Sequence, residues 1–329
     1  MKPCLLLLPL ALLACGPDDG DASGDDTDAE PVDLRVDYPE PAPDAMVFET
    51  PDLVIPAYSD VQFCYALTYD GAEDLGIVHM ANYQGPGGHH LVIFGTTSTQ
   101  RDVPDGTLWD CTSTSDLNME DMEPVIFGGV LERDDEMTVN TLDLPDGMGV
   151  VLQAGQRMVI QSHYINTHEY PILVHDQAQF DVIPEDDVQT WASPFALSND
   201  RFDIPAGATD YTSDFTCHWS GEPVNLLFLG PHMHEWGKAF RFEQTPAGGG
   251  DPVALIDEPT WDPVYRDAPN IQRFDGGQRV IQTGDALRTS CTWFNDTEAN
   301  LVFPHEMCVT FGLVFPQKLP WICDAGDGE

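Results

Sequence analysis

The sequence has few basic residues and no apolar run long enough for a transmembrane helix. It contains 13 lysines and arginines against 56 aspartates and glutamates, a formal net charge of −43 at pH 7. A surface this acidic repels nucleic acid and other phosphate-rich partners. The sequence therefore predicts no nucleic-acid partner, and we interpret most of the charge as a well-solvated surface.

Motifs of several common site classes are also missing. No two cysteines form a CxxC pair, which argues against a zinc knuckle. Neither a nucleophile elbow nor a glycine-rich phosphate loop is present. The sequence thus gives no support to a serine hydrolase or a nucleotide-binding protein.

The first residues have the features of an export signal. Residues 1–15, "MKPCLLLLPLALLAC", begin with a basic residue and continue with an apolar run too short to span a bilayer. The ending "LLAC" resembles a bacterial lipobox, with Cys15 as the lipidated first residue of the mature chain; the alternative is a plain secretory signal with a chance cysteine. We therefore predict an exported lipoprotein of the bacterial cell envelope whose membrane contact is the lipid anchor only. Gly16 favours the outer membrane by resemblance to known sorting patterns.

The segment after Cys15 is acidic and carries few large apolar side chains, so we predict a disordered tether over 16–43. Beyond it, strand-like runs bounded by Gly, Pro, Asp or Asn recur along the chain, while helical periodicity is scarce. This pattern is typical of β-sandwiches or barrels. The segment "FDVIPEDDVQTW" indicates a boundary, which predicts domains at 44–184 and 185–324 and a tail at 325–329.

The cysteine count indicates disulfide bonds. Cys4 lies in the predicted signal and Cys15 at the predicted anchor, so an even number remains in the exported chain. Exported chains with an even number of cysteines commonly form disulfides, which predicts three here. The six residues are Cys64, Cys111, Cys217, Cys291, Cys308 and Cys323.

Five of the ten histidines fall in three short motifs, "GGHHLVIFG", "VIQSHYIN" and "GPHMHEWGK". His232 and His234 are two positions apart, so on a strand they share a face and form half of a metal site. His89 and His90 would face opposite sides of a regular strand; both can reach one ion only if the backbone is twisted or bulged, which the glycines of "QGPGGHH" permit. By itself, His163 is an ordinary core histidine.

These motifs, in this order, resemble the copper type II, ascorbate-dependent monooxygenases. The likeness lies in "HH" at the start of a strand, "QSHY", "HMHEWGK" and "EMC", and covers roughly residues 50–323. The segments "GDALRTSCTWFN" and "EMCVTFGLVFPQKLPWIC" are most similar to the dopamine branch of the family. With the strand pattern, this leads us to expect an all-β fold of two tandem jelly-roll-type antiparallel β-sandwich domains.

The resemblance implies two copper ions per chain. His89, His90 and His163 would hold an electron-transfer copper, and His232, His234 and Met307 a copper that binds O2. Three imidazoles suit a copper that only cycles an electron, and a thioether suits Cu(I) while leaving a position open for O2. Without the family likeness, Met307 would be assigned to core packing. The remaining histidines are expected to have no role in metal binding: His79, His168, His175, His218 and His305.

The resemblance also implies the cysteine pairing Cys64–Cys111, Cys217–Cys323 and Cys291–Cys308. Two further cysteines of the animal enzymes' first domain, with their partners, have no counterpart in this sequence. The expected activity is hydroxylation of a C–H bond of a small organic substrate with O2 and an external reductant such as ascorbate. Two alternatives are a lipid-anchored copper-binding or storage protein without turnover, and a sandwich whose histidines bind nothing.

The sequence departs from the peptide-amidating branch at its substrate-binding positions. Gly230 stands where that branch has an arginine for the substrate carboxylate, and Val309 and Phe311 stand where it has asparagine and tyrosine. A buried carboxylate without partners is costly. We therefore expect a neutral or cationic substrate and not a glycine-extended peptide.

Overall fold

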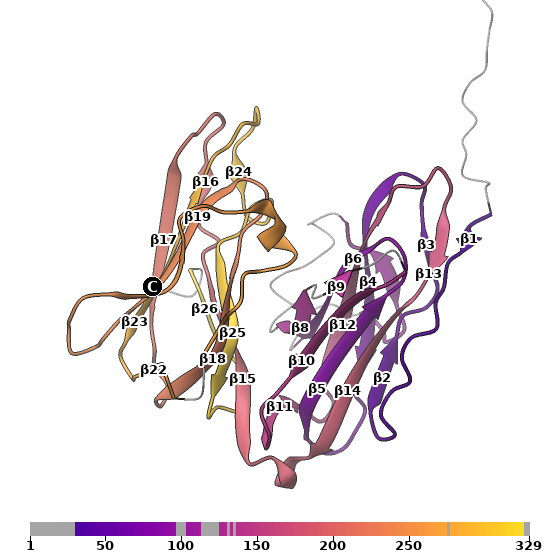
Figure 1. Ribbon diagram of the computed structural model, residues 1–329, viewed down its shortest axis with the longest axis horizontal. Coiled ribbons are helices and arrows are strands. Elements are labelled where there is room, and N and C mark those ends of the chain that lie inside the picture. The colour runs from indigo at the N-terminus through magenta and orange to yellow at the C-terminus, as the bar shows by residue number, and fades with distance from the viewer. Residues whose placement is uncertain are drawn as a thin grey trace, which may run out of the picture. The chain divides into compact units, whose positions relative to one another are not determined.

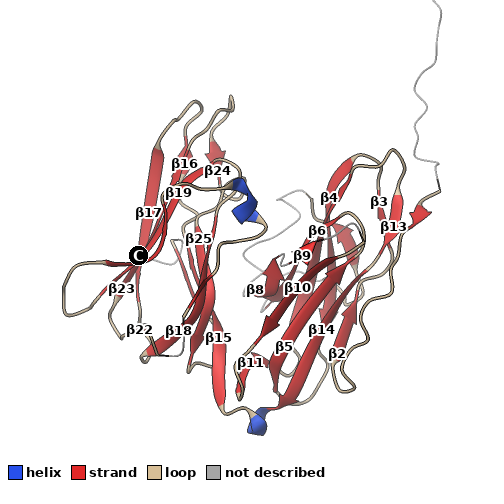
Figure 2. Cartoon of the chain, viewed as in Figure 1, coloured by secondary structure: helices blue, strands red, loops and turns tan. Residues whose placement is uncertain are grey.

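The computed structural model describes residues 30–96, 103–112, 125–129, 132–133, 136–274 and 277–325. The predicted signal, Cys15, most of the tether and residues 326–329 lie outside the described residues. Strands joined by turns make up the described chain, with two short 3-10 turns, η3 (Glu185–Asp187) and η4 (Pro263–Arg266) (Figure 2). The fold is therefore all-β, as predicted. We call residues 31–184 the first half and residues 185–325 the second half.

The first half contains two large sheets that enclose a common core (Figure 1). One sheet consists of β2 (Met46–Glu49), β14 (Asp176–Pro184), β5 (Leu75–Gln84), β11 (Met148–Leu152), β10 (Thr138–Asp143) and β9 (Glu132–Arg133). The other has the order β7 (Leu108–Asp110), β4 (Ser59–Thr68), β12 (Arg157–Asn166), β6 (Gly88–Thr96) and β8 (Val125–Gly129). A small third sheet has the order β1 (Val32–Asp33), β13 (Ile172–Val174) and β3 (Leu53–Ile55).

The second half repeats the sandwich arrangement. One sheet consists of β26 (Trp321–Asp324), β15 (Thr190–Ser198), β25 (Val309–Phe315), β18 (Val224–His232), β21 (Gln272–Arg273) and β22 (Val280–Ile281). The facing sheet has the order β17 (Tyr211–His218), β23 (Ala286–Trp293), β19 (Gly237–Thr245) and β20 (Val253–Glu258). A separate pair joins β16 (Asp203–Ile204) to β24 (Leu301–Val302). Aromatic side chains such as Trp219, Trp293 and Phe242 fill the space between the two large sheets.

One sheet continues from the first half into the second. Strands β11 and β15 pair in parallel, with Met148 opposite Thr190 and Val150 opposite Ala192. The core of the first half also includes Leu313 of β25. The turn η3 lies between β14 and β15, within the segment where the sequence predicts a domain boundary. Among the described residues, the two sandwiches thus share backbone hydrogen bonding and apolar packing.

The tether predicted for 16–43 ends earlier than expected, because residues 31–43 are part of the folded body. Strand β1 pairs with β13, and the Arg35 guanidinium bonds to the carboxylates of Asp33 and Asp52. The Tyr38 ring stacks on Tyr83 at a centroid distance of 5.6 Å. The aromatic ring and the ion pairs bind this acidic segment to the sandwich, and composition alone did not reveal them.

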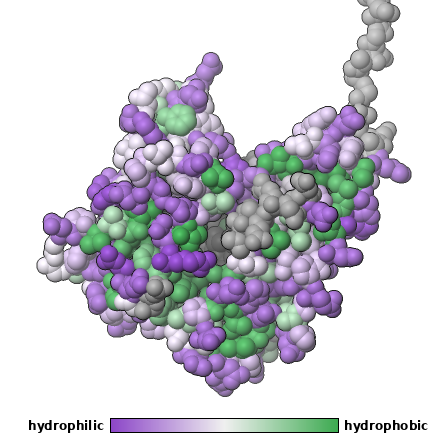
Figure 3. Space-filling model, viewed as in Figure 1, coloured by the Kyte–Doolittle hydropathy of each residue, from purple (hydrophilic) through white to green (hydrophobic). Residues whose placement is uncertain are grey.

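The surface is mostly hydrophilic, as the acidic composition predicts. Hydrophilic residues cover most of the face shown in Figure 3, and the hydrophobic residues on it form separate patches. Large apolar side chains that are exposed, such as Tyr58 and Leu319, lie far apart in the sequence. No helix among the described residues is long and apolar enough to cross a membrane.

The alternation of side chains places the histidines of β6 and β12 on the outer face of their sheet. In β6, Leu91 and Ile93 point into the core between the sheets, and in β12, Met158 and Ile160 do the same. His90 and His163 each directly adjoin an inward-pointing position, so they face the other way. This alternation leaves the histidines clear of the apolar core.

A polar cluster is buried between the two sheets of the first half. Asp176 is fully buried, and its carboxylate accepts a hydrogen bond from the Tyr164 hydroxyl. The Gln84 amide donates to the backbone carbonyl of His163 at 3.4 Å. Burial raises the pKa of Asp176 from 3.8 to about 6, even though the hydrogen bond from Tyr164 opposes the shift. Asp176 therefore releases its proton less readily in the folded than in the unfolded chain.

Asp176→Asn should change the pH dependence of stability. The folded pKa lies above the unfolded one, so folded wild-type protein keeps a proton that the unfolded chain loses as the pH rises from about 4 to about 7. Over that range wild type should lose up to about 3 kcal/mol of unfolding free energy relative to Asp176→Asn. Urea unfolding of both proteins across the range measures this difference. A constant difference would mean that Asp176 titrates normally.

Candidate metal centres

A β-bulge in β6 turns His89 and His90 toward the same site. In the pairing with β12, His90 lies opposite His163 but Gly88 lies opposite Tyr164, so His89 is an extra residue in its strand. A Cβ atom on Gly88 would lie 2.5 Å from the Gln84 Cβ, a distance that side-chain packing does not allow. Gly87 has a φ of 83°, a conformation that glycine adopts without strain. The glycines before the histidine pair therefore permit the bulge that the sequence indicated.

The imidazoles of His89, His90 and His163 converge; we call them the three-histidine cluster. The Nδ1 atom of His90 lies 3.3 Å from the His89 Nδ1 and 3.5 Å from the His163 Nδ1. One ring nitrogen from each residue lies within 4.8 Å of the other two, which is close enough for all three to hold one ion. The structure thus brings together three of the predicted ligands from two strands.

The far nitrogens of two of these rings face carboxylates. His163 Nε2 lies 2.6 Å from Asp60 Oδ1, and His89 Nε2 lies 3.3 Å from Asp267 Oδ2. A carboxylate at the far nitrogen fixes the imidazole's orientation and leaves the other nitrogen for a metal. The rings are therefore held with their Nδ1 atoms toward one another.

Burial keeps His90 and His163 neutral. It lowers the pKa of His163 to about 4, with a further contribution from the neighbouring His90, against the opposing effect of Asp60. Burial also lowers the pKa of His90, although Asp267 opposes the shift. Neutral imidazoles offer a lone pair at pH 7, which metal binding requires.

His232 and His234 lie together at the end of β18. Their ring centroids are 5.1 Å apart, and Met233 between them points into the core. The two histidines therefore share a face, as their spacing predicts. His234 Nδ1 donates to the backbone carbonyl of His305 at 2.9 Å, which leaves its Nε2 available. Burial lowers the pKa of His232 to about 3 and that of His234 to about 4, so both are neutral at pH 7.

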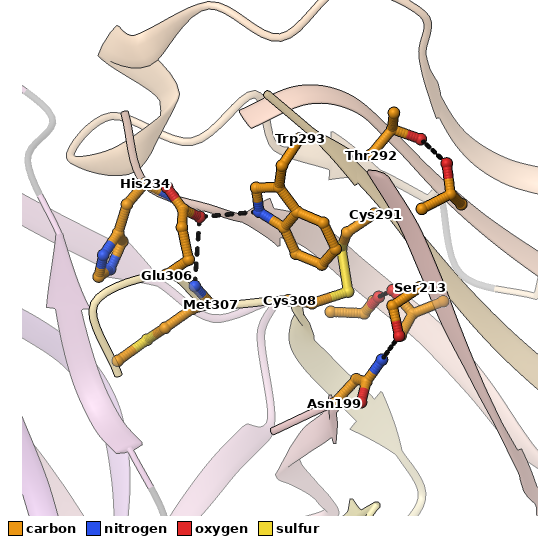
Figure 4. Close-up of a disulfide and its surroundings, with 12 residues drawn as sticks. Asn199, Ser213, His234, Cys291, Thr292, Trp293, Glu306, Met307 and Cys308 are labelled. Atoms are coloured by element: carbon orange, nitrogen blue, oxygen red, sulfur yellow. Dashed lines mark hydrogen bonds between the residues drawn. A yellow bond between two sulfur atoms is a disulfide. The ribbon is translucent and has the colours of Figure 1, made fainter. Parts of the chain in front are cut away.

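A buried glutamate connects this histidine pair to Met307. Glu306 is fully buried, and its carboxylate accepts hydrogen bonds from the backbone N–H groups of His234 at 3.1 Å and Trp236 at 2.9 Å. The Trp293 indole donates to the same carboxylate at 2.8 Å, and the Met307 N–H lies 3.3 Å from it. In Figure 4 the Met307 thioether and the His234 imidazole extend to the same side of Glu306. We call His232, His234 and Met307 the histidine–methionine cluster.

Three site residues were not predicted from the sequence. Asp60 and Asp267 lie far along the chain from the histidines that they contact, and nothing in their local sequence distinguishes them from other surface aspartates. Glu306 stands in the "EMC" motif, but its role as a buried acceptor depends on strands that are distant in sequence. Contacts with residues distant in the sequence identify all three, and Asp267 and Glu306 are in addition largely buried.

The structure contains the three predicted disulfides, Cys64–Cys111, Cys217–Cys323 and Cys291–Cys308. The last joins β23 to the residue directly after Met307, where it limits movement of that backbone (Figure 4). Disulfides form and persist in oxidising compartments. The bonds therefore support the predicted export of the chain.

Comparisons with known proteins assign neither a family nor a function to the chain. No family model and no curated protein matches the chain. Among solved structures, a protein from Eubacterium rectale classed as secreted has a TM-score of 0.24 and 10% identity, over 77% of this chain and 68% of that one. A structure of infectious bursal disease virus Gx strain has a TM-score of 0.22 and 9% identity, over 82% of this chain and 71% of that one. Similarity this low carries no argument about function.

Glu306→Ala should destabilise the protein strongly. The change leaves the N–H groups of His234, Trp236 and Trp293 without their buried acceptor, and each such group costs about 1–3 kcal/mol. We expect a loss of at least about 3 kcal/mol in unfolding free energy, measured by urea denaturation. Glu298→Ala removes the same charge from an exposed position and should stay within about 0.5 kcal/mol of wild type. Equal effects of the two changes would contradict an anchoring role for Glu306.

Proposed function

We propose that this chain is a copper-dependent monooxygenase of the type II, ascorbate-dependent family, hydroxylating a C–H bond of a small organic substrate. The main support is the presence of two donor sets with different chemistry in one chain. The three-histidine cluster offers imidazoles only, and the histidine–methionine cluster offers two imidazoles and a thioether. Two copper ions, O2 and an external reductant such as ascorbate complete the proposed reaction.

The donor atoms fit copper. Neutral imidazoles suit copper in both of its oxidation states, and a thioether favours Cu(I), whereas Mg²⁺ and Ca²⁺ prefer oxygen ligands. The lowered pKa values of His163, His232 and His234 keep protons from competing at neutral pH. When bound, copper supplies the one-electron and O2 chemistry.

The chain's own residues hold the donors in place. The carboxylate of Asp60 orients His163, and the carbonyl of His305 orients His234. Glu306 fixes the backbone on both sides of the histidine–methionine cluster, because it accepts from His234 and lies beside the Met307 N–H. Such prepared geometry reduces reorganisation during reaction, which is a main contribution of a protein to metal chemistry.

The substrate proposal gains support from the surroundings of Gly230. This residue lies opposite Phe311 in the pairing of β18 with β25. A Cβ atom at Gly230 would lie 2.4 Å from the Phe311 ring and 2.7 Å from Ile271 Cδ1. A cationic side chain for a substrate carboxylate therefore has no room at this position. We propose a neutral or cationic substrate, such as an amine with an aromatic ring.

We also propose that Cys15 carries a lipid anchor that holds the folded body at a bacterial membrane, most simply the outer one. Export signals and lipidation explain both the apolar start of the sequence and the disulfides of the body. The anchor would be the chain's only contact with the membrane.

Copper analysis tests the two sites directly. The wild-type protein should bind two copper ions per chain, and His163→Ala should bind about one, because only one donor set is damaged. The remaining copper, reduced to Cu(I), should still bind carbon monoxide at the histidine–methionine cluster. Infrared spectroscopy of the bound carbon monoxide reports this. Loss of both ions in His163→Ala, or absence of copper in wild type, would contradict the proposal.

Turnover distinguishes an enzyme from a copper store. With copper, ascorbate and O2, we expect the wild-type protein to hydroxylate a phenethylamine and to leave a glycine-extended peptide unchanged, as measured by mass spectrometry and O2 uptake. Efficient hydroxylation of the peptide would overturn the substrate proposal. Copper binding without turnover of any C–H substrate would favour storage.

Met307→Ile provides the matched variant for this assay. Isoleucine is apolar and of similar volume, so its packing cost should stay below about 1.5 kcal/mol. If Met307 is a ligand, activity should collapse while the melting temperature changes little. If the Met307→Ile protein is fully active, Met307 is a packing residue and not a metal ligand.

A further inference from the structure

The glycines before His89 permit the bulge in β6 but do not select it. Gly87 and Gly88 tolerate many backbone conformations, including the regular strand in which His89 and His90 point to opposite faces. The direction of His89 therefore depends on contacts that favour the bulged conformation over the regular one. The facing sheet of the first sandwich supplies such contacts from the side opposite the imidazoles.

Three buried residues form one row across that facing sheet; we call them the polar row. Gln84 of β5 lies directly opposite Thr138 of β10 on one side and directly opposite Asp176 of β14 on the other. None of the three is more than 5% exposed. Each of them forms a hydrogen bond with β6 or β12, the two strands that carry the three-histidine cluster.

Thr138 contacts the bulge itself. Its hydroxyl donates to the backbone carbonyl of Gly88 at 2.8 Å. That carbonyl belongs to the peptide group that joins Gly88 to His89, and His89 is the extra residue of the strand. The bond therefore fixes the orientation of the peptide through which the chain enters the bulge.

The other two members of the polar row hold the neighbouring strand at the same level. The Gln84 amide donates to the carbonyl of His163 at 3.4 Å, and a Cβ atom on Gly88 would lie only 2.5 Å from the Gln84 Cβ. Asp176 accepts a hydrogen bond from Tyr164, the residue opposite Gly88. The register between β6 and β12 shifts between His163 and Tyr164, so the row contacts both strands where the bulge lies.

We propose that Thr138 is a positioning residue of the three-histidine cluster, whose hydroxyl holds the bulge in the conformation that turns His89 toward His163. This inference deepens the proposed copper function, because it explains how the third imidazole is brought to the ion. In the held conformation the ring centroids of His89 and His163 are 4.7 Å apart. Without the bond, His89 can turn away with the regular strand, and two imidazoles remain.

Nuclear magnetic resonance of the metal-free full chain, with labelled histidine rings, tests this geometry without copper. Thr138→Val replaces the hydroxyl with a methyl group, and Thr138→Ser keeps the hydroxyl. Thr141→Val is the matched control, because Thr141 lies on the same strand but on its opposite face. The nuclear Overhauser effect between the rings of His89 and His163 is the readout.

This ring contact should weaken or vanish in Thr138→Val and persist in wild type, Thr138→Ser and Thr141→Val. The melting temperature identifies any variant that does not fold. Thr138→Ala, which removes the hydroxyl without adding a group, then takes the place of Thr138→Val. An unchanged ring contact in a folded chain that lacks the hydroxyl would overturn the positioning role.

Copper binding tests the consequence for the donor set. The chain carrying His232→Ala is used, so that copper loads the three-histidine cluster. In this background Thr138→Val should lower the Cu(II) affinity about 10-fold or more, measured by chelator competition. Pulsed electron paramagnetic resonance should count fewer bound imidazoles. Thr138→Ser and Thr141→Val should match the background.

The two measurements separate the possible failures. An unchanged affinity and imidazole count in Thr138→Val would overturn the positioning role while leaving the copper proposal intact. If the His232→Ala chain binds no copper although the ring contact responds to Thr138→Val as expected, the copper function fails at this cluster and the positioning role stands.

Discussion

Successive side chains of a strand point to opposite faces, so neighbouring histidines cannot normally reach one ion. In β6 the extra residue at His89 removes this obstacle, and it does so beside the one position of β12 that carries a histidine. Gly87 and Gly88 make the local backbone possible, and inward-pointing Leu91 fixes which face the rest of the strand presents. The geometry of the three-histidine cluster depends on this single irregularity in an otherwise regular sheet.

The two clusters are prepared by different means. In the three-histidine cluster, side-chain carboxylates hold the far nitrogens of His89 and His163. In the histidine–methionine cluster, the buried Glu306 holds backbone N–H groups, and a disulfide adjoins Met307. The first arrangement fixes ring orientation, and the second fixes the path of the chain. An imidazole needs orientation about its own bonds, whereas a flexible thioether is positioned mainly through its backbone.

The sequence predicted features that depend on local pattern. Short strands with turn residues and the shared face of His232 and His234 follow from alternation, and the glycines before His89 indicated that the strand could be distorted there. The resemblance to a copper enzyme family supplied the cysteine pairs, which the structure contains. Asp267 could not be predicted in this way, because its position relative to His89 depends on how the second sandwich packs.

The sequence did not predict that residues 31–43 are folded, for a related reason. An acidic composition predicts disorder when no partner is known, but Tyr38 and Arg35 have partners whose positions only the fold supplies. Charge and hydropathy indicate whether a segment would be ordered in isolation. They do not describe the surface against which it packs.

The parallel pairing of β11 with β15 has a consequence for how the chain matures. An exported chain emerges from its amino end, so the first sandwich reaches the outer compartment while β15 is still to come. Until then β11 presents an open edge with unpaired backbone groups, and such edges recruit strands of other chains. The few residues of η3 place β15 directly after β14, so the correct partner is the next strand to emerge. A short connection at this point therefore shortens the time for which the edge of β11 lacks its partner strand.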